Sequence, residues 1–233
     1  MTGDRRHPLA VLASEVVECD ACPELRSYCA EVARTRRRAF ADQTYWGRPV
    51  PGFGDFDAAI LVVGLAPAAH GANRTGRMFT GDRSGDFLYA ALHRCGLANQ
   101  PTATSRADGL ELRGVYITAP LRCAPPQNRP TTRQLARCAR FLDAEFDHLT
   151  PPVTVCLGGI AWNAMLALLK RRGVAWPRPK PKFAHGCELT LGGTTLLGCY
   201  HVSQQNTFTG RLTPPMLDAV LTRAGEMVAS KRG

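Results

Sequence analysis

The sequence predicts an α/β protein: a single α/β/α domain with a four-stranded, mainly parallel sheet and helices on both faces. Four short runs of apolar and β-branched residues recur along the chain, and segments with helical periodicity separate them. This alternation favours parallel strands, because each parallel connection needs a crossover that is usually a helix. The predicted strands are Ala58–Val63, Gly114–Thr118, Val153–Leu157 and Thr194–Tyr200.

The helical segments carry apolar stripes, and two of them have clear start signals. Thr131 or Thr132 can cap one helix, and Thr213 precedes Pro214, a residue that suits the first helical position. A chain of 233 residues with 45% hydrophobic content is long enough for one large domain over residues 1–233. The predicted helices are Pro8–Glu18, Glu24–Arg38, Ser84–Cys95, Thr132–His148, Ala161–Arg171 and Pro214–Ala229.

Composition limits the compartment and the partners. The formal net charge of +10 suits a polyanion such as DNA, although it also suits a basic protein kept in solution by its charge. Glu15 and Glu18 interrupt the only apolar stretch near the N-terminus, so we expect no export signal and no membrane span. Nine cysteines in such a chain favour a reducing compartment, the cytoplasm, and metal or cluster chemistry over disulfides.

Four cysteines have a spacing that is compatible with a metal centre. Cys19 and Cys22 form a C-x2-C pair, and Cys123 and Cys138 come from a loop and the helix after it. Four thiolates can hold zinc or a [4Fe–4S] cluster, and the spacing does not choose between them. An ordinary structural role for these cysteines is the alternative. The other five are expected to pack in the core: Cys29, Cys95, Cys156, Cys187 and Cys199.

Ligands of open parallel sheets bind outside the carboxyl ends of the strands, so the loops after the strands are the candidate site. The first of them, Gly64–Asp82, is rich in glycine but fits neither the dinucleotide fingerprint nor the P-loop. It places an aromatic residue, Phe79, close to a carboxylate, Asp82. This combination favours a pocket for a flat ring.

Four motifs in these loops resemble those of the iron–sulfur-type uracil-DNA glycosylases, and specifically the fifth, or b-type, family. They are GLAP at Gly64–Pro67, GRMFTGDRSG at Gly76–Gly85, RCAPPQNRPT at Arg122–Thr131 and HVSQQNTFTGRLT at His201–Thr213. The resemblance implies an α/β/α fold with a four-stranded parallel sheet. It also implies a structural [4Fe–4S] cluster on Cys19, Cys22, Cys123 and Cys138, with the N-terminal segment helping to bind it.

The same resemblance implies excision of uracil from DNA, with an abasic site as product. The chain has Leu65 and Ala119 where the related fourth family has a polar residue and an asparagine. The small Ala119 predicts a roomier pocket that also accepts other deaminated or damaged bases, such as hypoxanthine. The matched motifs contain no lysine for a Schiff base, so we expect no strand cleavage.

The chemistry assigns roles to the matched residues. A base must be flipped out of the duplex, stacked and read, and Phe79 is the stacking candidate. His201 can donate a hydrogen bond to the anionic leaving base, and Asp82 can position water or stabilise the sugar cation. Asp82 could instead only cap the next helix. Further pocket candidates are Asn128, for which a turn role is the alternative, Asn73, the fallback polar group, and Ala66 of the GLAP motif.

The last motif is expected to grip the DNA. Ser203, Asn206 and Arg211 can hold phosphates, and Phe208 can fill the gap left by the flipped base. Arg34–Arg38 ends a predicted helix and could contact phosphate or face solvent, whereas Trp176–Lys182 is expected to be an extended surface connection.

Two other functional classes compete with the glycosylase. One is a non-catalytic, cluster-bearing nucleic-acid-binding protein of the same fold, and the other is a flavodoxin-like nucleotide or redox protein. The unmatched dinucleotide and P-loop templates count against the second. We expect a monomer in the cytoplasm, associated with the nucleoid, with DNA as its partner. A sliding clamp is compatible with this role, but no residue indicates one.

Overall fold

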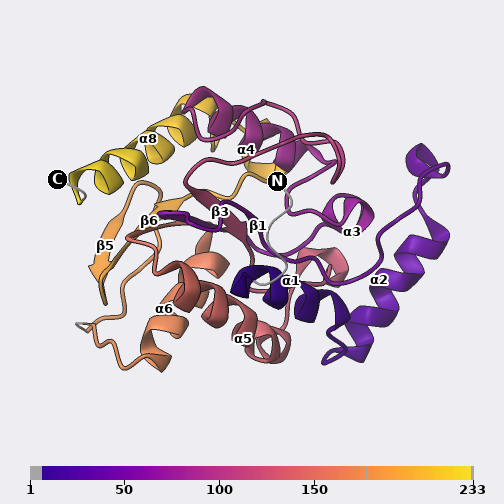
Figure 1. The fold of residues 1–233 in the computed structure, drawn as a ribbon, viewed down its shortest axis with the longest axis horizontal. Helices are drawn as coiled ribbons and strands as arrows, with labels where there is room; N and C mark the ends of the chain where they lie inside the picture. The colour runs from indigo at the N-terminus through magenta and orange to yellow at the C-terminus, as the bar shows by residue number, and fades with distance from the viewer. Residues whose placement is uncertain (1–6, 177, 232–233) are drawn as a thin grey trace.

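The computed structural model describes residues 7–176 and 178–231 as a twisted sheet between two layers of helices (Figure 1). The sheet order is β1-β3-β2-β4-β6-β5, and its four central strands are parallel. These strands confirm the four predicted ones within two residues at each end. They are β2 (Ile60–Val63), β3 (Val115–Thr118), β4 (Val153–Leu157) and β6 (Thr194–Cys199).

The predicted strand count was too low, because a short antiparallel strand adds to each edge. β1 (Phe53–Gly54) pairs with β3 and is too short to leave a periodic pattern. β5 (Glu188–Leu191) forms a hairpin with β6, and its side chains alternate between exposed and half-buried. Gly192 and Gly193 join the two strands with φ of 56° and 85°, as a two-residue hairpin turn requires. The Gly-Gly pair between two β-type runs was the available signal for this hairpin.

Helices cover both faces of the sheet, as expected. One layer contains α1 (Pro8–Glu18), α2 (Pro23–Thr35), α5 (Thr132–Leu149) and α6 (Gly159–Arg171). The other contains α4 (Arg83–Arg94) and α8 (Pro214–Ser230), which lie along the upper side of the view in Figure 1. Four short helical turns complete the described chain: η1 (Arg38–Phe40), α3 (Ala72–Thr75), η2 (Pro126–Asn128) and α7 (Gln204–Phe208).

The strands are buried on both faces, which explains why they are continuous apolar runs. In β2, Leu61 and Val63 pack into the core under α1, α5 and α6, whereas Ile60 and Val62 pack into the core under α4 and α8. All four β2 residues are buried. A strand covered on both sides loses the alternation of a half-exposed strand, so length and β-branching were the useful signals.

Details of the helix ends differ from the predictions. Thr131 forms a full capping box with Gln134, but the Thr213 side chain makes no capping hydrogen bond. The arginine run does not simply end a helix: α2 stops at Thr35, Arg36 has a left-handed φ of 51°, and the η1 turn follows. In residues 7–176 and 178–231, no helix combines the length and apolar character needed to cross a bilayer.

Candidate active site

The carboxyl ends of the central strands meet at one edge of the sheet. Val63 is in register with Thr118 on one side and Cys156 on the other, and Leu157 is in register with Cys199. The backbone pairing continues one residue further, because Gly64 N–H donates to Thr118 O and Gly158 N–H donates to Cys199 O, both at 2.8 Å. The loops after the four central strands, three of which carry the motifs, therefore leave the sheet side by side.

Phe79 and His201 form the centre of this edge. Their ring centroids are 6.3 Å apart at an interplanar angle of 38°. Two glycines make room for them: a Cβ on Gly64 would lie 2.7 Å from Phe79 Cζ, and a Cβ on Gly158 would lie 3.3 Å from His201 Cβ. Phe79 itself has a left-handed φ of 52°, which is uncommon for a bulky residue and directs its ring over Gly64. Such outliers concentrate at functional sites.

The environment of His201 keeps its ring neutral. Burial lowers the pKa of His201 from 6.5 to about 4. Among the described residues, its ring nitrogens have no hydrogen-bond partner, while its backbone carbonyl accepts a hydrogen bond from Asn206 Nδ2 at 2.8 Å. A neutral, half-buried imidazole can offer an N–H donor to a ligand without first losing a bond to the protein.

Asp82 sits at the N-terminus of α4, where it is the N-cap. Its Oδ1 accepts a hydrogen bond from Gly85 N–H at 3.0 Å, so the capping alternative is confirmed as a contact. Its other oxygen, Oδ2, lies against Gly71, where a Cβ would come within 1.9 Å. Burial raises the pKa of Asp82, and the N–H groups of Gly85 and Ser84 oppose that shift. The catalytic role of Asp82 stays a prediction.

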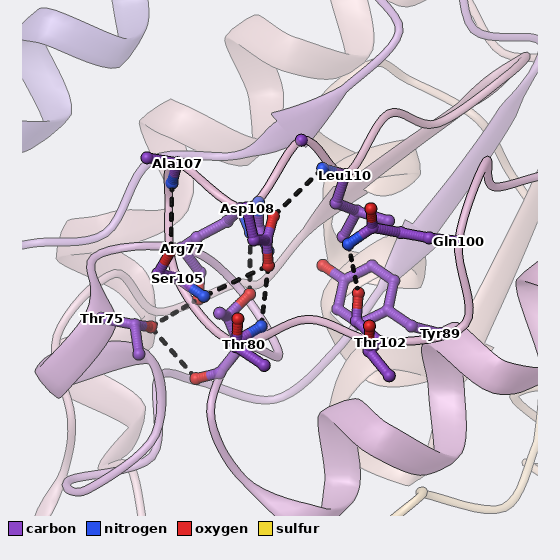
Figure 2. A network of polar contacts seen from close by, with 12 residues as sticks. Thr75, Arg77, Thr80, Tyr89, Gln100, Thr102, Ser105, Ala107, Asp108 and Leu110 are labelled. Carbon is purple, nitrogen blue, oxygen red and sulfur yellow. Dashed lines mark hydrogen bonds and ion pairs between the residues drawn. The ribbon is translucent and has the colours of Figure 1, made fainter.

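A buried polar network fixes the loop between β2 and α4 (Figure 2). Arg77 makes a two-point ion pair with Asp108, at 2.8 and 2.7 Å, and donates through Nε to Thr80 Oγ1 at 2.9 Å. Tyr89 Oη from α4 donates to Met78 O at 2.8 Å. Met78 and Thr80 flank Phe79, so this network holds the backbone on both sides of the predicted stacking residue. This network was not predicted, because Asp108 lies in a polar segment whose sequence indicates only a loop.

The structure does not place three of the predicted pocket residues against Phe79 and His201. Asn73 is fully buried, and its Nδ2 donates to Cys29 O and Ala69 O, both at 3.3 Å, which ties α3 to α2. Asn128 is exposed at the end of η2 with a left-handed φ of 56°, as in the turn alternative. Ala66 is half-buried against the core under α1, α5 and α6. Their roles in binding a base stay predictions.

The predicted DNA-gripping residues lie on and around α7, directly after His201. Phe208 is the more exposed of two large hydrophobic side chains that stand out in the described chain, at 66%, and Arg83 lies over its ring at 5.4 Å. Arg211 is exposed and packs over the Tyr200 ring at 4.5 Å. Ser203 is the N-cap of α7, but its side chain makes no capping bond there. Arg83 and Tyr200 were missed, since only the fold brings them to this surface.

The four predicted cluster cysteines share one small cavity between the N-terminal segment and α5. Cys22, Cys123 and Cys138 are buried and Cys19 is half-buried. Burial raises the pKa of Cys138 to about 11, and Arg122 opposes this shift. The other residues around the cavity are Ala21, Leu25, Arg26, Pro49, Leu121, Arg122 and Arg137.

The donor set of this cavity is compatible with a bound cluster. Within residues 7–176 and 178–231, no three His, Cys, Asp or Glu side chains are arranged to hold one metal ion. Four thiols around one cavity are the usual ligands of an iron–sulfur cluster. Buried guanidinium nitrogens of Arg26 and Arg122 beside the cavity have no hydrogen-bond partner in the described chain, which fits an anionic group.

An open α/β sheet that brings an aromatic ring and a neutral imidazole together at its carboxyl edge has the general form of a ligand-binding α/β protein. The sequence model of the Uracil DNA glycosylase superfamily matches residues 51–224. The type-5 uracil-DNA glycosylase of Mycobacterium tuberculosis is 56% identical over 214 residues, covering 90% of this chain and 78% of the relative.

Two relatives from other organisms carry the same family name. The type-5 uracil-DNA glycosylase of Thermus thermophilus is 52% identical over 209 residues, which cover 88% of this chain and 92% of the relative. That of Pyrobaculum aerophilum is 46% identical over 211 residues, which cover 91% and 89%. The chain belongs to the type-5 uracil-DNA glycosylase family of this superfamily.

Proposed function

We propose that the protein hydrolyses the N-glycosidic bond of uracil in DNA and leaves an abasic site. The observation that carries the proposal is the Phe79–His201 pair, held at 6.3 Å above Gly64 and Gly158 at the carboxyl edge of the sheet. An aromatic face and an uncommitted neutral imidazole are what a flipped uracil needs for stacking and for stabilising charge on its oxygen.

In this mechanism Phe79 stacks on the extruded base. His201 donates an N–H hydrogen bond to the uracil oxygen, where negative charge develops as the glycosidic bond breaks. Burial strengthens this bond because little water competes for the developing charge. Asp82 holds the attacking water or faces the electron-poor sugar. Asn128 and Ala66 are proposed as further contacts of the base, and Asn73, whose side chain is buried between α2 and α3, as the fallback polar group.

The pocket also accepts larger deaminated bases in this proposal. Ala119, just beyond β3, is buried and carries only a methyl group where an asparagine would narrow the pocket. Hypoxanthine is therefore included among the proposed substrates. The reaction stops at the abasic site, because the matched motifs supply no lysine to cleave the strand.

Asp82→Asn is the first variant to test, because it separates catalysis from helix capping. Asparagine caps helices as well as aspartate does, so the unfolding midpoint should change little. Loss of the charge should reduce uracil release by about 100-fold or more, as for a missing general acid–base group. Release is measured on a labelled duplex with one uracil, followed by alkaline cleavage.

Two controls complete this experiment. Asp82→Ala removes both functions, so it should lose activity and about 1 kcal/mol of stability. Full activity in Asp82→Asn would remove Asp82 from the chemistry. A wild type that binds the duplex but releases no base would favour the non-catalytic nucleic-acid-binding protein instead.

DNA binding is proposed to use two surfaces beside the pocket. The first is the α7 surface with Ser203, Asn206, Phe208 and Arg211, where Phe208 fills the gap in the base stack. The second is the arginine arm, defined as Arg36, Arg37 and Arg38 after α2, which extends from the body at the end opposite β5 (Figure 1).

The arm is anchored to the pocket loop. Tyr45 Oη accepts a hydrogen bond from Arg37 N–H and lies 3.0 Å from His70 Nδ1, and Arg74 packs on the Phe40 ring at 3.9 Å. His70 and Arg74 belong to the same loop as Phe79. A strand whose base enters the pocket would therefore pass near these cations.

The double variant Arg37→Gln/Arg38→Gln is expected to weaken DNA binding at low salt. Each lost phosphate contact lowers the slope of log K against log[salt] by about 0.9, so the slope should fall by about 2. Fluorescence anisotropy with a uracil-containing duplex, titrated at several salt concentrations, measures this. Arg113→Gln/Lys170→Gln, at exposed positions by the start of β3 and the end of α6, is the matched control. Equal slopes in both double variants would exclude the arm.

Cys19, Cys22, Cys123 and Cys138 are proposed to bind a [4Fe–4S] cluster. Bound there, the cluster supplies cross-links between the segment joining α1 to α2, the loop after β3 and α5, without taking part in bond cleavage. The rest of the proposal is a monomer that acts on DNA at the nucleoid in the cytoplasm, where its free cysteines stay reduced. Association with a sliding clamp is compatible with this location.

A further inference from the structure

Three buried nitrogen atoms beside the cysteine cavity have no hydrogen-bond partner among residues 7–176 and 178–231. They are Nη1 of Arg26 and Nε and Nη1 of Arg122, and both side chains line the cavity. Buried polar groups are nearly always satisfied, and charged ones are costly when they are not. Two guanidinium groups with unused donors at one cavity therefore indicate an anionic ligand.

Arg122 is fixed in place from its other side. Its Nη2 pairs with Glu145 Oε2, and Glu145 also accepts hydrogen bonds from Thr118 Oγ1 and Tyr116 Oη. Arg122 and Glu145 are each 1% exposed. The planar guanidinium cannot turn without breaking this pair, so its remaining N–H groups are held in fixed directions for a second acceptor.

Arg26 has no counter-charge of this kind. It lies on α2 one turn after Cys22, and no hydrogen bond or ion pair links its guanidinium to another described residue. It lines the same cavity as Cys19, Cys22, Cys123 and Cys138. Arg26 therefore faces the thiol-rich side of the molecule.

We propose that Arg26 and Arg122 are positioning residues that hold the anionic cluster, by donating N–H hydrogen bonds to its sulfur atoms. The inference rests on the cluster proposed above. A [4Fe–4S] core with four thiolate ligands is net negative, and hydrogen bonds to its sulfurs and nearby charge set its stability and reduction potential. Half-buried Arg137 and exposed Arg140 form the rim of the cavity, and each already has an acceptor in the protein: Arg137 Nη1 donates to Ala21 O at 3.2 Å, and Arg140 Nη2 donates to Cys19 Sγ at 3.5 Å.

The test uses the full-length protein purified without oxygen. Iron and sulfide content, the visible absorption of the cluster, and its half-life in excess EDTA are measured for the wild type and four variants. Arg26→Gln removes the charge without breaking a bond seen in the structure, and Arg26→Lys restores it. Arg122→Lys keeps the partner of Glu145 but removes donors, and Arg137→Gln is the rim control.

Removing a group that hydrogen-bonds to the ligands of a metal commonly alters metal affinity by 10- to 100-fold. The half-life of the cluster in EDTA should therefore be shorter by about 10-fold or more in Arg26→Gln. Arg26→Lys should recover part of the lifetime, Arg122→Lys should fall between, and Arg137→Gln should match the wild type. The reduction potential should move to more negative values in Arg26→Gln, because a positive charge favours the more anionic reduced cluster. Thermal unfolding, monitored by circular dichroism, checks that each variant is folded.

The outcomes are distinct. Equal cluster lifetimes and equal reduction potentials in wild type and Arg26→Gln would overturn this inference without contradicting the proposed cluster. A wild type without iron and sulfide would overturn both the cluster and the inference, while uracil release would remain a separate measurement.

Discussion

His201→Ala is expected to lower uracil release by about 100- to 1000-fold, the loss seen when one donor to a developing oxyanion is removed. The His201 ring is close to Phe79, and no hydrogen bond to its ring nitrogens is seen in the described structure, so its N–H is available to the base. Duplex binding should change little, because the proposed phosphate contacts lie on α7 and the arginine arm. Single-turnover release and anisotropy on the same uracil duplex separate the two effects.

The pH dependence sharpens this prediction. With a pKa of about 4, His201 stays neutral from about pH 5 upward, so it should impose no loss of rate near pH 6.5. The folded pKa lies below that of the unfolded chain, so the unfolded state binds the proton more readily between about pH 4 and 6.5. His201 therefore lowers stability as the pH falls through this range, and His201→Ala should flatten that decline in urea unfolding.

His148→Ala, at an exposed position near the end of α5, is the matched control and should behave as wild type. Retention of more than a tenth of the wild-type rate in His201→Ala would show that another group stabilises the leaving base. A wild-type rate that changes around pH 6.5, with the change absent in His201→Ala, would show that His201 titrates near its usual pKa. In that case His201 would not act as a permanently neutral hydrogen-bond donor.

Arg77→Met is expected to cost about 3–5 kcal/mol of stability, the usual loss when one partner of a buried ion pair is removed. Asp108 would keep a buried charge, with the N–H groups of Thr104, Ser105 and Leu110 as its remaining donors (Figure 2). The loop on both sides of Phe79 would loosen as well, so uracil release should fall more than duplex binding. Urea unfolding at pH 7 and the release assay measure both.

The charge on Asp108 makes this loss depend on pH. Burial works against ionisation, but the hydrogen bonds from Arg77 and the three N–H groups hold the pKa of Asp108 well below its usual range. An acid whose folded pKa is depressed adds stability above its unfolded pKa and loses it as the pH falls toward the folded value. The difference in unfolding free energy between wild type and Asp108→Asn should therefore be largest at pH 7 and should shrink below about pH 4.

Asp218→Ala provides the contrast, because it breaks the Arg94–Asp218 pair, in which the two side chains are 44% and 30% exposed. Such surface pairs contribute about 0–1 kcal/mol. Equal losses in Arg77→Met and Asp218→Ala would mean that the network in Figure 2 does not stabilise the loop.

The central strands, the six long helices and the order of the functional loops could be predicted from the amino-acid sequence. These features depend on local information: β2 and β4 are short β-branched runs, and α5 begins with a capping box at Thr131. The cysteine spacing also sufficed to select Cys19, Cys22, Cys123 and Cys138, which the fold then gathers at one cavity.

Which side chains contact one another became clear only from the folded arrangement. Asp108 lies 31 residues from Arg77 along the chain, and the hydrogen bond that joins them has no local pattern. The same is true of Gly64 and Gly158, which make room for Phe79 and His201, and of Arg26 and Arg122 at the cysteine cavity. Periodicity records which face of an element is buried, whereas contacts between distant segments depend on how the parallel strands align their ends.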